Sequence, residues 1–202
     1  MKNCWVKWIC LGLLSTATLG ADPLHEVLAK NSVIAVVTWR TAIEDLYCAA
    51  TLDDSVRSNA TTVLACYSKS KDSPIFTTRL NPGLVQLEVL GLIDGPLLAS
   101  WGTGSGYGFA AFAYEQGKVK KVWSGGSYLP FEMYWADPSA NSFILSLADP
   151  AWVEVNGEKE RVAANAELLL WQDGKFKTLG TVPWNERHRV STANVKKSPD
   201  SR

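Results

Sequence analysis

The chain has 202 residues, and its twenty basic and twenty acidic side chains leave no formal net charge. This balance argues against a nucleic-acid binder, because such proteins hold phosphates with an excess of lysine and arginine. A chain of this length folds around one core or a small set of tightly packed repeats. After the N-terminal segment, no apolar run approaches the roughly 20 residues of a membrane-spanning helix.

The first twenty residues have the pattern of a secretory signal peptide. Two basic residues, Lys2 and Lys7, lie near the start of the chain. An apolar stretch covers 8–14, and small residues follow up to Gly20. A basic start, a short apolar core and small residues at the cleavage site are typical of such signals. We expect cleavage after Gly20, or after Ala21, and a secreted or periplasmic protein; the alternative is a buried N-terminal helix.

The segment after the signal predicts a short helix and then a strand. Asp22 is a capping residue, Pro23 occupies the first helical position, and Leu24 begins an apolar spacing of helical type. From 33 to 39, apolar residues occupy both faces of a period-two pattern, as in a strand that is buried on both sides.

Residues 41–52 admit two interpretations. Thr41 and Glu44 have the spacing of a helical capping box. The same residues also fit a turn that leads into a strand over 46–52. We favour the strand, because it gives this part of the chain the hairpin pattern that recurs further along.

Two cysteines remain after cleavage, Cys48 and Cys66. If 46–52 and 62–67 are the arms of a hairpin, its centre falls at Arg57, inside a polar turn. Directly opposed residues of antiparallel strands lie about 4.5–5.5 Å apart at Cα, which a disulfide bridges. We therefore predict a Cys48–Cys66 disulfide, which suits an oxidising compartment. Two buried thiols are the alternative, and the spacing does not suit a metal site.

Three places in the chain share an apolar strand that ends in Tyr or Trp, a tight polar turn, and a second strand. They are 63–67 with 75–76, 111–114 with 119, and 168–171 with 176. Two further strands precede each hairpin, at 85–89 and 97–101 in the middle unit and at 131–135 and 143–147 in the last. The sequence therefore predicts a mostly β domain over 21–184, made of three antiparallel four-stranded units. The polar sequence of 185–202 predicts a disordered tail.

The turns of the last two units are nearly identical, Glu115-Gln116-Gly117-Lys118 and Gln172-Asp173-Gly174-Lys175. With the aromatic residue before them, they resemble the outer hairpin of the blade repeats in integrin-like and related bacterial β-propellers. The calcium loop of Asp-x-Asp-x-Asp-Gly type that such blades often carry is absent, and three units are fewer than the roughly four to eight blades of a propeller. Either several chains complete a ring, or the three sheets pack as a closed prism that resembles the architecture of some lectins.

Few residues have the character of catalytic groups. His25 and His188 fall in the predicted helix and tail, so we interpret both as solvated, and a histidine-dependent hydrolase is disfavoured. Four aspartates stand beside glycine or proline: Asp94, Asp137, Asp149 and Asp173. Aspartate in that setting is typical of turns, although a pair of them would also suit a glycosidase.

The segment from Trp101 to Gly108 has glycine at every second position. It matches neither a dinucleotide fingerprint nor a phosphate loop, so no cofactor is predicted. We interpret it as a flexible loop, or a strand that another backbone approaches closely. The alternative is a ligand-facing loop flanked by Trp101 and Tyr107, with Trp123 near the end of a later strand as a third aromatic contact.

From these patterns we predict an exported, non-enzymatic binding or protein-interaction module. Trp101, Tyr107 and Trp123 are its candidate ligand-binding residues, and its partner would be a protein or a carbohydrate. The alternatives are a carbohydrate-active enzyme that uses paired carboxylates, and a subunit of a larger exported assembly, including a homo-oligomer. No metal and no nucleic acid is expected.

Overall fold

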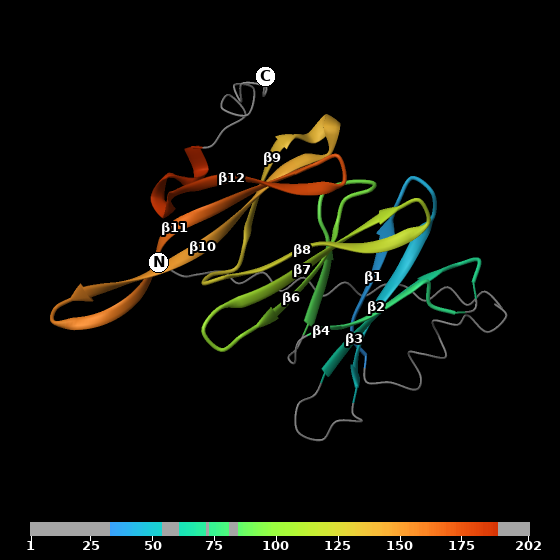
Figure 1. The fold of residues 1–202 in the computed structure, drawn as a ribbon, viewed down its shortest axis with the longest axis horizontal. Helices are drawn as coiled ribbons and strands as arrows, with labels where there is room; N and C mark the ends of the chain where they lie inside the picture. Colours follow the sequence, from blue (N-terminus) through green and yellow to red (C-terminus); the bar gives the residue numbers. More distant parts are fainter. Residues whose placement is uncertain (1–32, 54–60, 72, 81–84, 190–202) are drawn as a thin grey trace, which may run out of the picture.

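The computed structural model describes residues 33–53, 61–71, 73–80 and 85–189. These residues form twelve β-strands and two short 3-10 helices (Figure 1). The predicted signal peptide and the predicted helix at 22–28 lie outside the described residues. Within the described part of the chain, no helix is long and apolar enough to cross a membrane.

The strands form three separate sheets, and each sheet has four strands that follow one another along the chain. The first sheet contains β1 (Val33–Arg40), β2 (Asp45–Asp53), β3 (Thr61–Ser68) and β4 (Phe76–Leu80). The second contains β5 (Val85–Val89), β6 (Leu97–Gly102), β7 (Tyr107–Glu115) and β8 (Lys118–Ser127). The third contains β9 (Glu132–Asp137), β10 (Ser142–Val155), β11 (Glu158–Gln172) and β12 (Lys175–Pro183). All neighbouring strands are antiparallel, which confirms the predicted fold class.

The segment 41–52 is a turn followed by a strand, as the preferred interpretation predicted. Thr41 forms the turn: its hydroxyl accepts hydrogen bonds from the backbone N–H groups of Ile43 and Glu44 and donates one to the Glu44 carbonyl. The side chain that would cap a helix here closes a turn instead, and β2 begins at Asp45.

The predicted disulfide between Cys48 and Cys66 is confirmed. The two residues are directly opposed on β2 and β3, with their Cα atoms 4.1 Å apart, and both are fully buried. The disulfide therefore crosses the centre of the first sheet on the face that packs against the second.

The second sheet is the middle layer of the molecule. One face, with Leu97, Ala99 and Phe112, shares a hydrophobic cluster with the first sheet. Its other face, with Leu98 and Ala111, shares a second cluster with the third sheet. Because β6 is buried on both sides, its sequence is apolar at consecutive positions. The core is thus layered, whereas a three-sided prism would have all three sheets share one interior.

The outer face of the third sheet is covered by the end of the described chain. A third cluster, built on Ile144, Leu168 and Leu170, packs against Trp184, the first residue of the 3-10 helix η2 (Trp184–Arg189). The first residues of the predicted tail therefore belong to η2, and the rest of that tail, 190–202, lies outside the described residues. The other 3-10 helix, η1 (Pro138–Ala140), connects β9 to β10.

Candidate functional site

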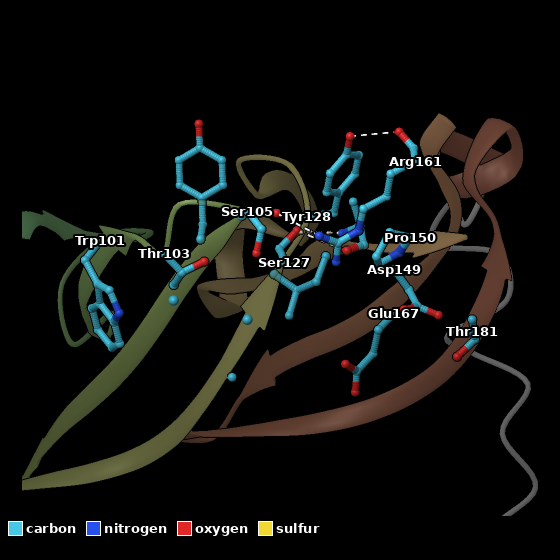
Figure 2. A pocket seen from close by; sticks show the side chains of 17 residues that line it. Trp101, Thr103, Ser105, Ser127, Tyr128, Asp149, Pro150, Arg161, Glu167 and Thr181 are labelled. Atoms are coloured by element: carbon cyan, nitrogen blue, oxygen red, sulfur yellow. Dashed lines mark hydrogen bonds between the residues drawn. The ribbon is translucent and has the colours of Figure 1, made fainter. Parts of the chain in front are cut away.

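A pocket of about 560 Å³ lies where the second and third sheets meet. The loop between β6 and β7 and the end of β8 line one side, and the middle of β10 and β11 lines the other. Figure 2 shows Trp101 at one end, Asp149, Glu167 and Thr181 at the other, and Ser105, Tyr128 and Arg161 between them.

Trp101 is fixed against the backbone of the neighbouring strand. It pairs with Gly108 across β6 and β7, and a Cβ atom added to that glycine would lie 2.4 Å from the indole. Only glycine therefore leaves room for the indole. The alternating glycines predicted that another backbone approaches closely, and at Gly108 the approaching group is instead the Trp101 side chain. The indole borders one end of the pocket and packs in the cluster that the second sheet shares with the first.

The ring of Tyr107 is supported by the ring of Phe109, two residues further along β7. It stacks on Phe109 with ring centroids 6.5 Å apart and an interplanar angle of 17°, while 37% of its surface stays exposed. The loop before it turns tightly, because the Thr103 N–H donates to the Gly106 carbonyl at 2.9 Å and Gly104 has a φ of +83°. Tyr107 is thus an exposed aromatic side chain with a fixed base.

The end of β8 is joined to the middle of β10 by hydrogen bonds. The Tyr128 N–H donates to the Ala148 carbonyl at 2.8 Å, and the Ser127 hydroxyl accepts from the Ala148 N–H at 2.8 Å. Ser127 and Ala148 are both buried. These bonds fix the second sheet to the third along the floor of the pocket.

Arg161 brings a positive charge to the pocket from β11. Its guanidinium lies 4.9 Å from the centre of the Tyr128 ring, and its Nη1 donates to the Ser105 carbonyl at 3.2 Å. The Tyr128 hydroxyl in turn donates to the Arg161 carbonyl at 2.8 Å. A guanidinium has five N–H donors, and the contact with Ser105 uses one of them. Sequence reasoning identified neither residue, since nothing local to 128 or 161 signals their meeting.

Two carboxylates line the same pocket. Asp149 comes from β10 at a register shift, and Glu167 comes from β11.

Two of the other aspartates that the sequence singled out have the turn roles expected of them. Asp94 accepts a hydrogen bond from the Ala42 N–H at 2.7 Å, and Asp137 caps η1.

Trp123 does not line this pocket, although it packs against Gly125, which does. Its ring packs 5.8 Å from that of Phe176 in the cluster between the second and third sheets, and it leans over Gly125. Of the three aromatic residues selected from the sequence, Trp101 and Tyr107 line the pocket from opposite faces of the second sheet, and the structure adds Tyr128. Among the described residues, no group of three or more His, Cys, Asp or Glu side chains is placed to hold a metal ion.

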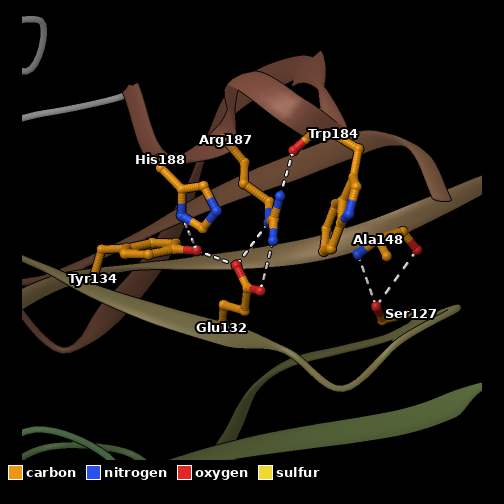
Figure 3. A network of polar contacts seen from close by, with 7 residues as sticks. All are labelled: Ser127, Glu132, Tyr134, Ala148, Trp184, Arg187 and His188. Carbon is orange, nitrogen blue, oxygen red and sulfur yellow. Dashed lines mark hydrogen bonds and ion pairs between the residues drawn. The ribbon is translucent and has the colours of Figure 1, made fainter. Parts of the chain in front are cut away.

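A second polar cluster joins η2 to β9 (Figure 3). Glu132 accepts hydrogen bonds from Nε and Nη2 of Arg187 at 2.7 and 2.8 Å, and a third from the Tyr134 hydroxyl. The hydrogen bonds of Arg187 hold the pKa of Glu132 at about 2, and burial, with the neighbouring Glu132, raises the pKa of Tyr134 to about 12.

His188 completes this cluster. Its Nδ1 lies 2.9 Å from the Tyr134 oxygen. The histidine that we expected to be a solvated tail residue thus contacts β9. Arg187 also lies 3.8 Å from the Trp184 ring, so the cluster secures η2 over the outer face of the third sheet.

No family model, no curated protein and no solved structure matches the chain.

Proposed function

We propose that this chain is an exported, non-enzymatic binding or protein-interaction module that takes its ligand in the pocket beside Trp101 and Tyr107. The observation that carries the proposal is that the groups that would touch a ligand are held in place beforehand. Gly108 seats the indole, Phe109 supports Tyr107, and the guanidinium of Arg161 is fixed by two contacts. A binding site whose side chains are already ordered loses less entropy when the ligand arrives.

A carbohydrate is the ligand class that suits these groups best. Flat aromatic faces pack on the apolar side of a sugar ring, while carboxylates and a guanidinium bind its hydroxyl groups. The pocket offers aromatic rings at Trp101 and Tyr107, and charged groups at Asp149, Arg161 and Glu167. A few fixed polar groups between aromatic walls are what orient a ligand in such a site. A peptide is the other outcome that the binding experiment would reveal.

Export is part of the proposal. The signal-like sequence of the first twenty residues supports it, and so does the disulfide between Cys48 and Cys66, since disulfides persist in oxidising compartments. We also infer that the three sheets are successive blades of a propeller-like arc. In support, β1 lies beside β5, the first strand of the next sheet, and the middle sheet is packed on both faces.

The test is a binding screen of the purified protein by thermal shift and calorimetry against soluble oligosaccharides and peptides. A ligand that binds only the native state raises its melting temperature. Tyr107→Ala should remove most of that rise with little change in the melting temperature of the free protein. Leu179→Ala is the matched control, because Leu179 is 38% exposed on β12 and lines none of the described pocket. Unchanged binding by Tyr107→Ala contradicts this assignment.

A carbohydrate-active enzyme is the second candidate, because Asp149 and Glu167 line one pocket. Most glycoside hydrolases use two carboxylates, one as the acid and the other as the base or nucleophile. Release of reducing ends from a bound polysaccharide, lost in both Asp149→Asn and Glu167→Gln, would favour this function. Binding without release in the wild-type protein favours the non-enzymatic module.

A further inference from the structure

Part of the third sheet projects beyond the rest of the molecule as a two-stranded arm (Figure 1). β9 pairs with β10 only over 142–146, and β12 pairs with β11 only over 165–172. Within the described chain, 150–155 and 158–163 therefore pair only with each other. We call residues 150–163 the arm. A two-stranded hairpin by itself is marginally stable in water, so a partner that covers the arm would stabilise it.

Trp152 is the most exposed large hydrophobic side chain of the described residues, with 68% of its surface in solvent. The edge strand β8 carries three lysines, Lys118, Lys120 and Lys121. Lysines on an edge strand discourage association with other chains. A tryptophan that stays exposed has the opposite effect, because tryptophan is the residue type most often found at the centre of protein interfaces.

The two faces of the arm differ in charge. Directly opposed residues of an antiparallel pair share one face of the sheet. The valine face contains Ala151, Val153 and Val155 from β10, opposite Val162, Glu160 and Glu158 from β11. The tryptophan face contains Trp152 and Glu154, opposite Arg161 and Lys159.

These charges select the face that suits a second copy of the chain. Two valine faces would place the glutamates Glu158 and Glu160 of both copies together, and like charges repel. Two tryptophan faces related by a two-fold axis would instead place Glu154 of each copy near Lys159 of the other. Arg161, the third charge on this face, contacts Tyr128 and Ser105 of its own copy. Two-fold dimers use the same patch on both copies, so each complementary contact occurs twice.

We propose that two copies of this chain dimerise through the tryptophan faces of their arms, with the two Trp152 side chains at the centre and Glu154 paired with Lys159 in both directions. The proposal does not depend on what the pocket binds, although Arg161 belongs to both the tryptophan face and the pocket. The face is smaller than the roughly 20–30 residues a side of a standard interface, so the dimer should form reversibly as the concentration of the protein rises.

The first test is sedimentation velocity of the purified protein over a wide range of concentration. The wild-type protein should pass from monomer to dimer, and Trp152→Ala should remain a monomer. Ile43→Ala is the matched control and should dimerise normally, because Ile43 is 65% exposed on the turn before β2. A wild-type monomer up to the limit of solubility, or dimerisation of Trp152→Ala at wild-type concentrations, overturns the proposal.

A second test uses two charge-reversed variants that should be monomeric alone and should dimerise when mixed. Glu154→Lys and Lys159→Glu each give the tryptophan face two like charges near its tip, so each variant alone should be monomeric. An equimolar mixture should form heterodimers, because the two faces then carry opposite charges. Mixing changes contacts between copies and leaves those within one arm as they are. A mixture that stays monomeric, with both variants folded by circular dichroism, overturns the pairing.

Discussion

The Glu132 carboxylate accepts two hydrogen bonds from the Arg187 guanidinium, at 2.7 and 2.8 Å, and this pair joins residues that are 55 positions apart in the sequence. Arg187 is largely buried, with 14% of its side chain exposed, and Glu132 keeps 34% exposed. Two parallel hydrogen bonds between a guanidinium and a carboxylate are among the stronger polar contacts in proteins. The pair is therefore the main polar attachment of η2 to the third sheet.

Acid should weaken this attachment. Arg187 holds the pKa of Glu132 at about 2, below its ordinary value of 4.5. A carboxyl whose pKa is lower in the folded state stabilises the fold above its unfolded pKa, and this contribution is lost as the pH falls toward the folded pKa. Allowing for solvent at Glu132, we expect a loss of about 1–2 kcal/mol between pH 5 and about pH 2. Urea denaturation at each pH measures it.

Glu132→Gln should lower the free energy of unfolding at neutral pH. It should also reduce the change in that free energy between pH 5 and about pH 2. Glu186→Gln is the control, because it removes a carboxylate from η2 outside this cluster. Equal acid sensitivity in the wild-type protein and in Glu132→Gln would show that other groups dominate acid unfolding.

Reduction of the disulfide should destabilise the protein. Cys48 and Cys66 are 18 residues apart, and a crosslink of that span stabilises a domain by about 3 kcal/mol, chiefly by restricting the unfolded chain. Thermal melting with and without a reductant measures the change. A variant with alanine at both positions should melt at the lower temperature in either buffer. A wild-type melting temperature that the reductant leaves unchanged contradicts this prediction.

The three sheets were predictable because their signals are local. The turns at 115–118 and 172–175 each place a glycine at positive φ, and period-two patterns flank them. The sequence predicted that Cys48 and Cys66 lie opposite each other, because a hairpin centred on Arg57 pairs these two positions. This prediction requires only that the two strands are neighbours.

The pocket and the end of the chain were not predictable in the same way, because both depend on contacts between sheets. Tyr128 and Arg161 meet only when the second sheet packs against the third. Trp101 and Trp123 each pack against a glycine, Gly108 and Gly125, and which of them borders a pocket depends on the sheet that covers each one. Residues 185–189 have the sequence of a tail, and within them Arg187 and His188 contact Glu132 and Tyr134 on β9.

Tyr114 should contribute to the contact between the first and second sheets. Its hydroxyl donates to Glu44, and its ring meets that of Trp39 edge-on at 6.3 Å. Tyr114→Phe keeps the ring and removes the hydrogen bond to a carboxylate, so the free energy of unfolding should fall by about 1–2 kcal/mol.

Tyr47→Phe is the control for Tyr114→Phe and should change stability by less than half as much. Within the described part of the chain, the Tyr47 hydroxyl has no hydrogen bond, and its ring lies beneath Lys69. Equal losses in the two variants, measured by urea denaturation, would show that the hydroxyl of Tyr114 has no specific role.

Gly108→Ala should displace the Trp101 indole, which borders one end of the pocket. The added Cβ would lie 2.4 Å from the Trp101 indole, which is packed against the core and cannot move without cost. Forcing an extra carbon into such a contact costs about 1–3 kcal/mol. We expect a lower melting temperature, a shift in tryptophan fluorescence and weaker binding of any ligand that protects the wild-type protein. Gly102→Ala is the matched control, since a Cβ there meets no atom within 4 Å. If both variants melt and bind alike, Gly108 does not hold the indole in place.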